Sequence, residues 1–312
     1  MGTSDLLKPA GTFFGVPRAV DASGSRVASV GIPFDMGRHP SRIGGRGGPD
    51  HIRAHSLLVA EHLRDFDVKV TSELGVVDLG DIDVTPGDVA SAFPRIEQVI
   101  GSIANCGAIP LSVGGDGAVT LPQLRALKRV HGPLALLHFD AHTDAYLDPD
   151  PGQPFNNANS FVHAAGEGLL DMSAAAHVGV RDTTYRDQYG PVGTARDMGY
   201  RVITMSELVS GGTDAVLAEL RGLVGDRPTY LCWDMDVFDP SASPGVVTPA
   251  WGGLTIREGL LMLEGLRGLD FVGFDINTVS PPHDVQGQSG SLAAHVMREC
   301  LFLAAESPGH VE

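Results

Sequence analysis

The sequence predicts a single-domain α/β fold, a three-layer sandwich in which a mainly parallel sheet of about eight strands carries helices on both faces. Apolar runs of strand length alternate with helical stretches along nearly the whole chain. The chain has 312 residues, of which 43% are hydrophobic, so it can bury the core of one large domain. Two of the apolar runs end in closely spaced acidic residues, which places a candidate site at their carboxyl ends.

Composition limits the partners and the compartment. The formal net charge of -16 argues against binding to nucleic acid or an anionic membrane and favours cationic small molecules. Cys106, Cys232 and Cys300 are scattered, and the first two fall in or beside apolar strand runs, which is typical of reduced core thiols. No signal-peptide pattern and no apolar run of membrane-spanning length occur, so we expect a soluble, cytoplasmic protein.

The chain begins with a leader rich in glycine and proline, residues 1–25, and residues 26–312 form the predicted domain. Arg26 to Pro33 is the first expected strand, and a helix is expected from about Asp50, with this aspartate as N-cap. The glycine-rich loop between them lacks the GxGxxG order of a dinucleotide site. It is therefore interpreted as a surface loop that lines the mouth of a pocket.

The remaining elements follow from the hydrophobic pattern. Expected strands lie at 68–84 (with turns), 108–117, 133–139, 176–181, 200–204, 229–233 and 271–276. Expected helices lie at 87–103, 119–130, 207–224, 256–269 and 291–305, and the segment between 181 and 200 is compatible with a helix. A polar, proline-rich loop, residues 149–160, follows the strand at 133–139 and is expected to contact substrate.

Acidic and imidazole side chains follow the apolar run from Pro133 to Phe139. If strand geometry continues past this run, its period of two turns Asp140, His142 and Asp144 to one side. Buried carboxylates this close together repel one another unless a cation compensates them. The pattern therefore indicates a divalent metal site with oxygen and imidazole ligands.

A second apolar run, from Thr229 to Trp233, ends in Asp234, Asp236 and Asp239. Carboxylate and imidazole ligands together suit manganese, nickel, zinc or iron, and the lack of clustered cysteines argues against structural zinc. The alternative is that each aspartate caps a helix or turns a loop after its strand. Repetition of the pattern at two strand ends favours the metal site.

Motifs that extend in order from Thr12 to the last helix resemble those of the ureohydrolases, the family of arginases and agmatinases, and especially its agmatinase branch. These motifs are FFGVP, GIPFD, GGPDHIR, LGDID, SVGGDG, HFDAHTD, DMDVFDP with SPGVVTPAWGG, and GFDINTVSPPHD. The resemblance implies an arginase-like fold and hydrolysis of a guanidino group, with two metal ions, to an amine and urea or a urea-like product. It also implies trimers or hexamers.

The same resemblance implies a set of ligands. Asp140 and Asp234 would bridge two Mn²⁺ or Ni²⁺ ions and hold the metal-bound hydroxide that attacks the guanidinium carbon. Asp144 would complete the first site, and His142 with Asp236 would complete the second.

Three positions depart from the family's motifs. Gly117 stands where a GGDH motif supplies a histidine to the first metal, and Asn157 stands where a loop histidine transfers a proton. Glycine offers no ligand, and asparagine is neither acid nor base near pH 7. Thr278 replaces the glutamate of an EVSP motif that contacts the guanidinium. We therefore expect an incomplete site, with one metal or substoichiometric metal, and Asn157 and Thr278 as substrate contacts.

A neighbouring histidine is the alternative source of the missing ligand. His39 and His283 lie in loops that could reach the site. His138, two residues before Asp140, is expected instead to be a core histidine or one that supports a ligand.

The leading hypothesis is a subunit of a metal-dependent amidinohydrolase for a cationic guanidine or a biguanide such as metformin. In this hypothesis the chain's own site is incomplete and the chain supports a homologous catalytic subunit in a heteromer. One alternative is a self-sufficient hydrolase with one metal held by Asp140, His142, Asp234 and Asp236. Another is a non-enzymatic regulatory homologue, against which the retained acidic clusters argue.

Overall fold

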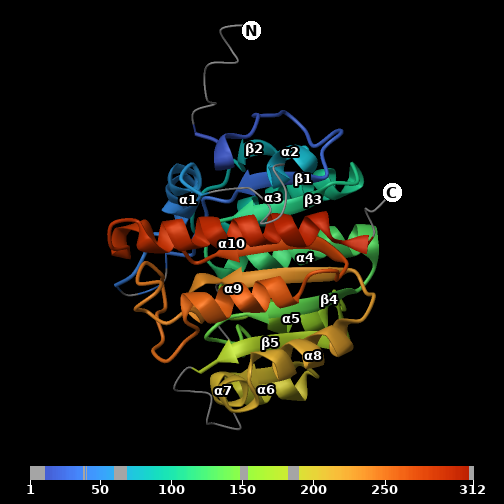
Figure 1. Cartoon of the computed structure of the whole chain (residues 1–312), viewed down its shortest axis with the longest axis vertical. Helices are drawn as coiled ribbons and strands as arrows, with labels where there is room; N and C mark the ends of the chain where they lie inside the picture. The colour runs from blue at the N-terminus through green and yellow to red at the C-terminus, as the bar shows by residue number, and fades with distance from the viewer. Residues whose placement is uncertain are drawn as a thin grey trace, which may run out of the picture.

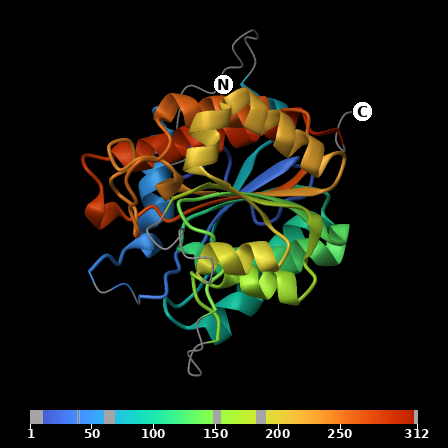
Figure 2. The same cartoon turned by 90° about the horizontal axis from the view of Figure 1, so that it is seen from below.

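The computed structural model describes residues 11–37, 39, 41–59, 69–147, 154–181 and 190–308. They form an eight-stranded sheet with the strand order β2-β1-β3-β8-β7-β4-β5-β6. All seven pairs of neighbouring strands are parallel. Helices cover both faces of this sheet, which gives three layers (Figure 2). The predicted fold class is confirmed.

The elements have the following bounds. The strands are β1 (Val27–Gly31), β2 (Val77–Asp81), β3 (Ile109–Val113), β4 (Leu134–Phe139), β5 (Leu170–Val180), β6 (Arg201–Thr204), β7 (Thr229–Asp234) and β8 (Phe271–Asn277). The helices are α1 (Gly48–Ser56), α2 (Val70–Glu73), α3 (Val89–Asn105), α4 (Thr120–His131), α5 (Ser160–Gly166), α6 (Pro191–Asp197), α7 (Met205–Gly211), α8 (Thr213–Val224), α9 (Ile256–Gly265) and α10 (Gln288–Ala305). Short 3-10 turns are η2 (Phe13–Gly15), η3 (Gly45–Gly47), η4 (Gly117–Val119), η6 (Met235–Val237) and η7 (Pro281–His283).

The sheet is buried on both faces, and β4 shows why its strands read as continuous apolar runs. Leu134 and Leu136 pack into the core under α3, α4, α5 and α6, whereas Leu137 and Phe139 pack into the core under α8, α9 and α10. Figure 1 shows α9 and α10 crossing the front of the sheet. Phe139 stacks on Trp233 of the adjacent β7, with ring centroids 4.5 Å apart. Both faces of each central strand therefore require apolar residues.

Several expected boundaries were wrong. The stretch 68–84 contains the short helix α2 before β2, and residue 68 lies outside the described residues. Helix α1 begins at Gly48, so Asp50 lies in its first turn and is not the N-cap. Gly212, with φ of 83°, divides the helix expected over 207–224 into α7 and α8. Strand β5 begins at Leu170, earlier than expected.

Cys106 and Cys232 were predicted to be reduced core thiols, and the prediction was wrong for the burial of Cys106. Cys232 is buried in β7, and Cys300 is buried in α10, and both carry free thiols. Cys106 is also free but exposed, because it caps the carboxyl end of α3 before β3 begins.

The described part of the leader packs on the domain. Phe13 and Phe14 are 0% and 8% exposed and belong to the core under α1 and α10. The backbone N–H of Ala19 donates to the carbonyl of Asp78 on β2. No helix among the residues placed by the structure is both long enough and apolar enough to cross a bilayer.

Replacing Leu137 with alanine tests the buried sheet. The side chain is 0% exposed, so its removal should leave a cavity and lower the free energy of unfolding by about 2–5 kcal/mol. Urea unfolding followed by circular dichroism measures the loss. Val209→Ala is the control, because that side chain is 71% exposed and should change stability by less than about 0.5 kcal/mol. Similar losses in both variants would contradict the assigned core.

Candidate metal centre

The two acidic clusters meet at the carboxyl edge of the sheet. Strands β4 and β7 are parallel neighbours, and Phe139 lies opposite Trp233 in their register. Asp140 and Asp234 follow these two residues directly, so the strand pairing itself brings them to one edge. The two acidic runs therefore converge at this edge of the sheet.

The local reason given for the first cluster was wrong. Strand β4 ends at Phe139, and strand geometry does not continue through the next residues. Asp144 has φ of 46°, in the left-handed region that few non-glycine residues adopt. A turn, and not the period of a strand, therefore brings Asp140, His142 and Asp144 together.

Two groups of side chains have the spacing of metal ligands. In each group, one nitrogen or oxygen atom per residue lies within 4.8 Å of the others. One group contains Asp140, His142 and Asp236, and the other contains Asp140, Asp144 and His138. Asp140 belongs to both groups, which agrees with its predicted bridging position. Asp234 belongs to neither, although it is buried beside them at 3% exposure.

Hydrogen bonds hold the group of Asp140, His142 and Asp236 in place. The backbone N–H of His142 donates to Oδ1 of Asp140 at 2.8 Å, and its Nδ1 lies 3.1 Å from the same oxygen. Nδ1 of His142 also lies 3.4 Å from Oδ2 of Asp236. Asp236 accepts from the backbone N–H of Ala141 and from the hydroxyl of Thr248. The three predicted ligands are therefore mutually oriented.

Thr278 contacts the acidic cluster. Its hydroxyl donates to Oδ1 of Asp234, and that oxygen also accepts the backbone N–H of Asp236 at 3.1 Å. Thr278 is 5% exposed and has φ of 66°. The side chain predicted to contact substrate is thus directed at a predicted metal ligand.

Burial and mutual repulsion dominate the electrostatics. Burial raises the pKa of Asp144 well above its usual value, and the charge of Asp140 raises it further. Burial also raises the pKa of Asp234, to which the charge of Asp236 adds. Burial and then the charge of Asp140 raise the pKa of Asp236 to about 6.

Asp140 and His142 shift in the opposite sense. Burial would raise the pKa of Asp140, but the nearby imidazoles of His138 and His142 outweigh it and hold the pKa well below its usual value. Burial would lower the pKa of His142, but the carboxylates of Asp236 and Asp140 raise it well above its usual value. The cluster therefore favours positive charge at its centre.

These residues fit a divalent cation. Oδ2 of Asp140 is buried and accepts no aligned hydrogen bond, although Nε2 of His138 lies 3.1 Å away, so at least one of its lone pairs is costly to bury unless a ligand uses it. The donors are carboxylate oxygens with imidazole nitrogens, and this set suits manganese and related ions. A bound cation would remove the repulsion that raises the carboxyl pKa values.

Position 117 faces the cluster. A Cβ atom built on Gly117 would lie 2.6 Å from Oδ2 of Asp144 and 3.0 Å from the carbonyl oxygen of Asn157. The hydroxyl of Ser160 donates to the carbonyl of Gly117 at 2.8 Å, which ties this turn to the loop that carries Asn157. A side chain at 117 would therefore point at Asp144.

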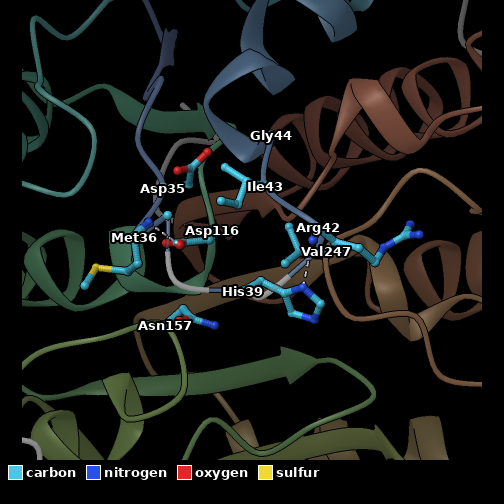
Figure 3. A pocket seen from close by; sticks show the side chains of 10 residues that line it. Asp35, Met36, His39, Arg42, Ile43, Gly44, Asp116, Asn157 and Val247 are labelled. Atoms are coloured by element: carbon cyan, nitrogen blue, oxygen red, sulfur yellow. Dashed lines mark hydrogen bonds between the residues drawn. The ribbon is translucent and has the colours of Figure 1, made fainter.

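A cavity of about 250 Å³ opens next to this turn. It is lined by Asp35, Met36, Gly37, His39, Arg42, Ile43, Gly44, Asp116, Asn157 and Val247. Figure 3 shows Asp35 and Ile43 above Asp116, with His39 and Asn157 below it. Asn157 lies where a substrate contact is expected, but neither Thr278 nor any of the five predicted ligands lines the cavity.

The loop histidines weighed as replacement ligands are occupied by other contacts. Nδ1 of His39 accepts the backbone N–H groups of Ser41 and Arg42. Nδ1 of His283 lies 2.8 Å from the hydroxyl of Ser280. Neither histidine belongs to a group with ligand spacing, whereas His138 does.

His177 was missed by the sequence reasoning. It lies opposite His138 in the register of β5 and β4, and their Nδ1 atoms are 2.7 Å apart. A signal was available, because each is a lone histidine within an apolar strand run. Nothing in either run indicates that the two strands are neighbours.

The chain is similar to known hydrolases over most of its length. The model of the arginase family matches residues 25–303. Guanidinopropionase of Pseudomonas aeruginosa is 40% identical over 296 residues, which cover 95% of this chain and 92% of that protein. Mitochondrial agmatinase of Gallus gallus is 35% identical, with 92% and 83% covered. The structure of proclavaminate amidino hydrolase from Streptomyces clavuligerus superposes with a TM-score of 0.89 at 33% identity, covering 96% and 98%.

Metal binding should stabilise the folded chain. A cation that binds only the native cluster should add about 2.7 kcal/mol at 100 times its Kd and raise Tm by about 4 °C. Thermal unfolding with Mn²⁺ and with a chelator measures this shift. Asp140→Asn should abolish it, whereas Asp214→Asn, at an exposed position on α8, should retain it. A shift that persists in Asp140→Asn would place the cation elsewhere.

Histidines at positions 117 and 157 should strengthen metal binding. Gly117 is not in the left-handed region, so Gly117→His need only displace the far end of the Asp144 side chain and relax against the Asn157 carbonyl. The double variant Gly117→His with Asn157→His should hold more Mn²⁺ per chain after dialysis, measured by elemental analysis. Gly117→Ala with Asn157→His is the matched control, because alanine adds the Cβ without a ligand. Unchanged metal content would show that position 117 is not adjacent to the first metal.

Proposed function

The chain belongs to the arginase family, and we propose that it is a subunit of a metal-dependent amidinohydrolase that cleaves a carbon–nitrogen bond of a guanidine or biguanide. The observation that carries the proposal is the convergence of Asp140, His142 and Asp236 at the carboxyl edge of the parallel sheet. Similarity over nearly the whole chain to guanidinopropionase supports a guanidine-type substrate.

The resident metal is proposed to be Mn²⁺ or Ni²⁺. Asp140 and Asp234 would contribute to both ions, His142 and Asp236 would complete one site, and Asp144 would complete the other, which we expect to hold its ion more weakly. When bound, such ions make a water acidic enough to attack a guanidinium carbon at neutral pH. Asp140 orients the site through its contacts with His142. The hydroxyl of Thr278 orients the carboxylate of Asp234 by donating a hydrogen bond to its Oδ1.

The cavity beside the cluster is proposed to admit the substrate. Asp116 lies in its wall, where burial and the charge of Asp35 raise its pKa to about 7. A cationic ligand would favour the ionised form of this carboxyl group. Asn157 lines the same cavity and can donate or accept hydrogen bonds, but it cannot transfer a proton near neutral pH.

The site of this chain is proposed to be incomplete, and a homologous catalytic subunit is proposed as partner in a trimeric or hexameric assembly. Two features support this. Gly117 has no side chain, but a side chain at this position would point at Asp144, where the family's motif places a ligand. Asn157 occupies the cavity where the resemblance places a proton donor. Metformin is a substrate of the proposed class, since it is a cationic biguanide.

A self-sufficient hydrolase with one metal is the second candidate. It is favoured by the group of Asp140, His142 and Asp236, which is complete without position 117.

Turnover with and without a partner decides between the two candidates. The chain alone should release little or no urea or amine from guanidine, agmatine, guanidinopropionate or metformin in the presence of Mn²⁺ or Ni²⁺. Co-expression with a homologous arginase-family chain encoded nearby should produce turnover, because that chain supplies the missing ligand and the proton donor.

The control is the same co-expression with Asp140→Asn in this chain. It shows whether turnover requires metal binding by this chain or only its assembly with the partner. Turnover by the purified chain alone would contradict the incomplete site. No turnover in either sample would contradict the substrate class.

A further inference from the structure

His138 and His177 form a buried pair directly behind Asp140. They are 1% and 0% exposed, and their Nδ1 atoms lie 2.7 Å apart across the β4 and β5 pair. Nε2 of His138 lies 3.1 Å from Oδ2 of Asp140. The three side chains thus form a continuous line from the core under α5 and α6 to a predicted metal ligand.

The proton positions along this line follow from the groups at its ends. An ionised carboxylate only accepts hydrogen bonds, and a neutral imidazole has one N–H and one lone pair. Nε2 of His138 must therefore carry the proton that faces Asp140. Its Nδ1 is then an acceptor, and Nδ1 of His177 is the donor to it.

The far end of the line agrees with this direction. Nε2 of His177 is buried and has no hydrogen-bond partner among the described residues. The rings of Phe161 and Tyr200 pack against the imidazole of His177, with ring centroids 5.1 and 4.5 Å from its centroid. A buried N–H without an acceptor is rarer than a buried acceptor without a donor, so this atom is assigned the lone pair.

We propose that His138 is a positioning residue that donates its Nε2–H to Asp140 and is itself oriented by His177. The remaining lone pairs of Asp140 would then point at a metal ion in a fixed direction. Hydrogen-bond partners that do not themselves bind the metal commonly orient metal ligands in this way. The inference rests on the proposed function, because it takes Asp140 as a metal ligand.

The contact of His138 with Oδ2 of Asp140 lacks the alignment of a full hydrogen bond. Such contacts at reactive sites tighten when the ligand binds, and a small rotation of the carboxylate would align this one. His138 also has the spacing of a direct ligand with Asp140 and Asp144. The experiment must therefore separate a hydrogen-bond donor from a ligand and from a residue that only fills space.

Two substitutions of His138 make this separation. The amide nitrogen of His138→Gln can donate to Asp140 from the place of Nε2, whereas His138→Leu fills similar volume without a donor. Isothermal titration of the full chain with Mn²⁺ should show binding weakened about 10- to 100-fold in His138→Leu and largely retained in His138→Gln. Equal weakening in both would overturn the proposal, because glutamine would then fail as a donor.

The same logic applies one step further back. His177→Asn can still donate to Nδ1 of His138, and His177→Leu cannot. We expect Mn²⁺ affinity to fall in the leucine variant and to be largely kept in the asparagine variant. Thermal unfolding of the variants in the presence of a chelator is the control for folding. If the histidines had only a structural role, the substitutions would lower Tm, and the two variants at each position would bind Mn²⁺ equally.

Nitrogen-15 NMR of histidine-labelled, metal-free protein reads the proton positions directly. The signals of His138 are identified as those that the wild-type spectrum shows and the His138→Gln spectrum lacks. They should report a protonated Nε2 and an unprotonated Nδ1, and the opposite pattern would overturn the proposal. Failure of the wild-type chain to bind Mn²⁺ would instead contradict the proposed function, and the NMR measurement would still decide whether His138 donates to Asp140.

Discussion

The crowding of buried carboxylates at the carboxyl edge of β4 and β7 is the constraint on which the rest of the site depends. Because the strands are parallel neighbours, Asp140 and Asp234 must emerge side by side. Burial raises the pKa values of Asp234 and Asp236, and the surrounding donors compensate only part of the charge. The backbone N–H and Nδ1 of His142 both contact Oδ1 of Asp140. Thr278 and the backbone N–H of Asp236 both donate to Oδ1 of Asp234. A divalent cation would compensate the remainder, so we expect metal binding to stabilise the fold locally as well.

The fold was predictable because burial on both faces leaves a plain signal. The runs that form β4 and β7 are largely apolar up to the acidic residues, and they are too short for typical buried helices. The signal failed where a helix and a strand share one apolar stretch, as at α2 and β2. It also failed at Gly212, since the amphipathic pattern continues across a break that only the backbone reveals.

The sequence predicted that certain side chains lie close together, but not the geometry that brings them there. Asp140, His142 and Asp236 were predicted as ligands because closely spaced acidic residues after a buried strand repel one another unless a cation lies between them, and the structure places these three within ligand spacing. The left-handed backbone conformation of Asp144 could not be predicted from the sequence, because aspartate seldom adopts a positive φ. The pair of His138 and His177 joins positions 39 residues apart, so only the order of the strands brings them together.

The proposed absence of a ligand at position 117 need not damage this fold, and the turn at Gly117 shows why. The carboxylate of Asp116 accepts the backbone N–H groups of Met36 and Ala118, and Ser160 binds the carbonyl of Gly117. These contacts hold the turn through its backbone and through side chains other than that of residue 117. Chemistry at position 117 is thereby separated from folding. Glycine at position 117 is therefore compatible with an intact fold, which is the condition that the proposed supporting subunit would have to meet.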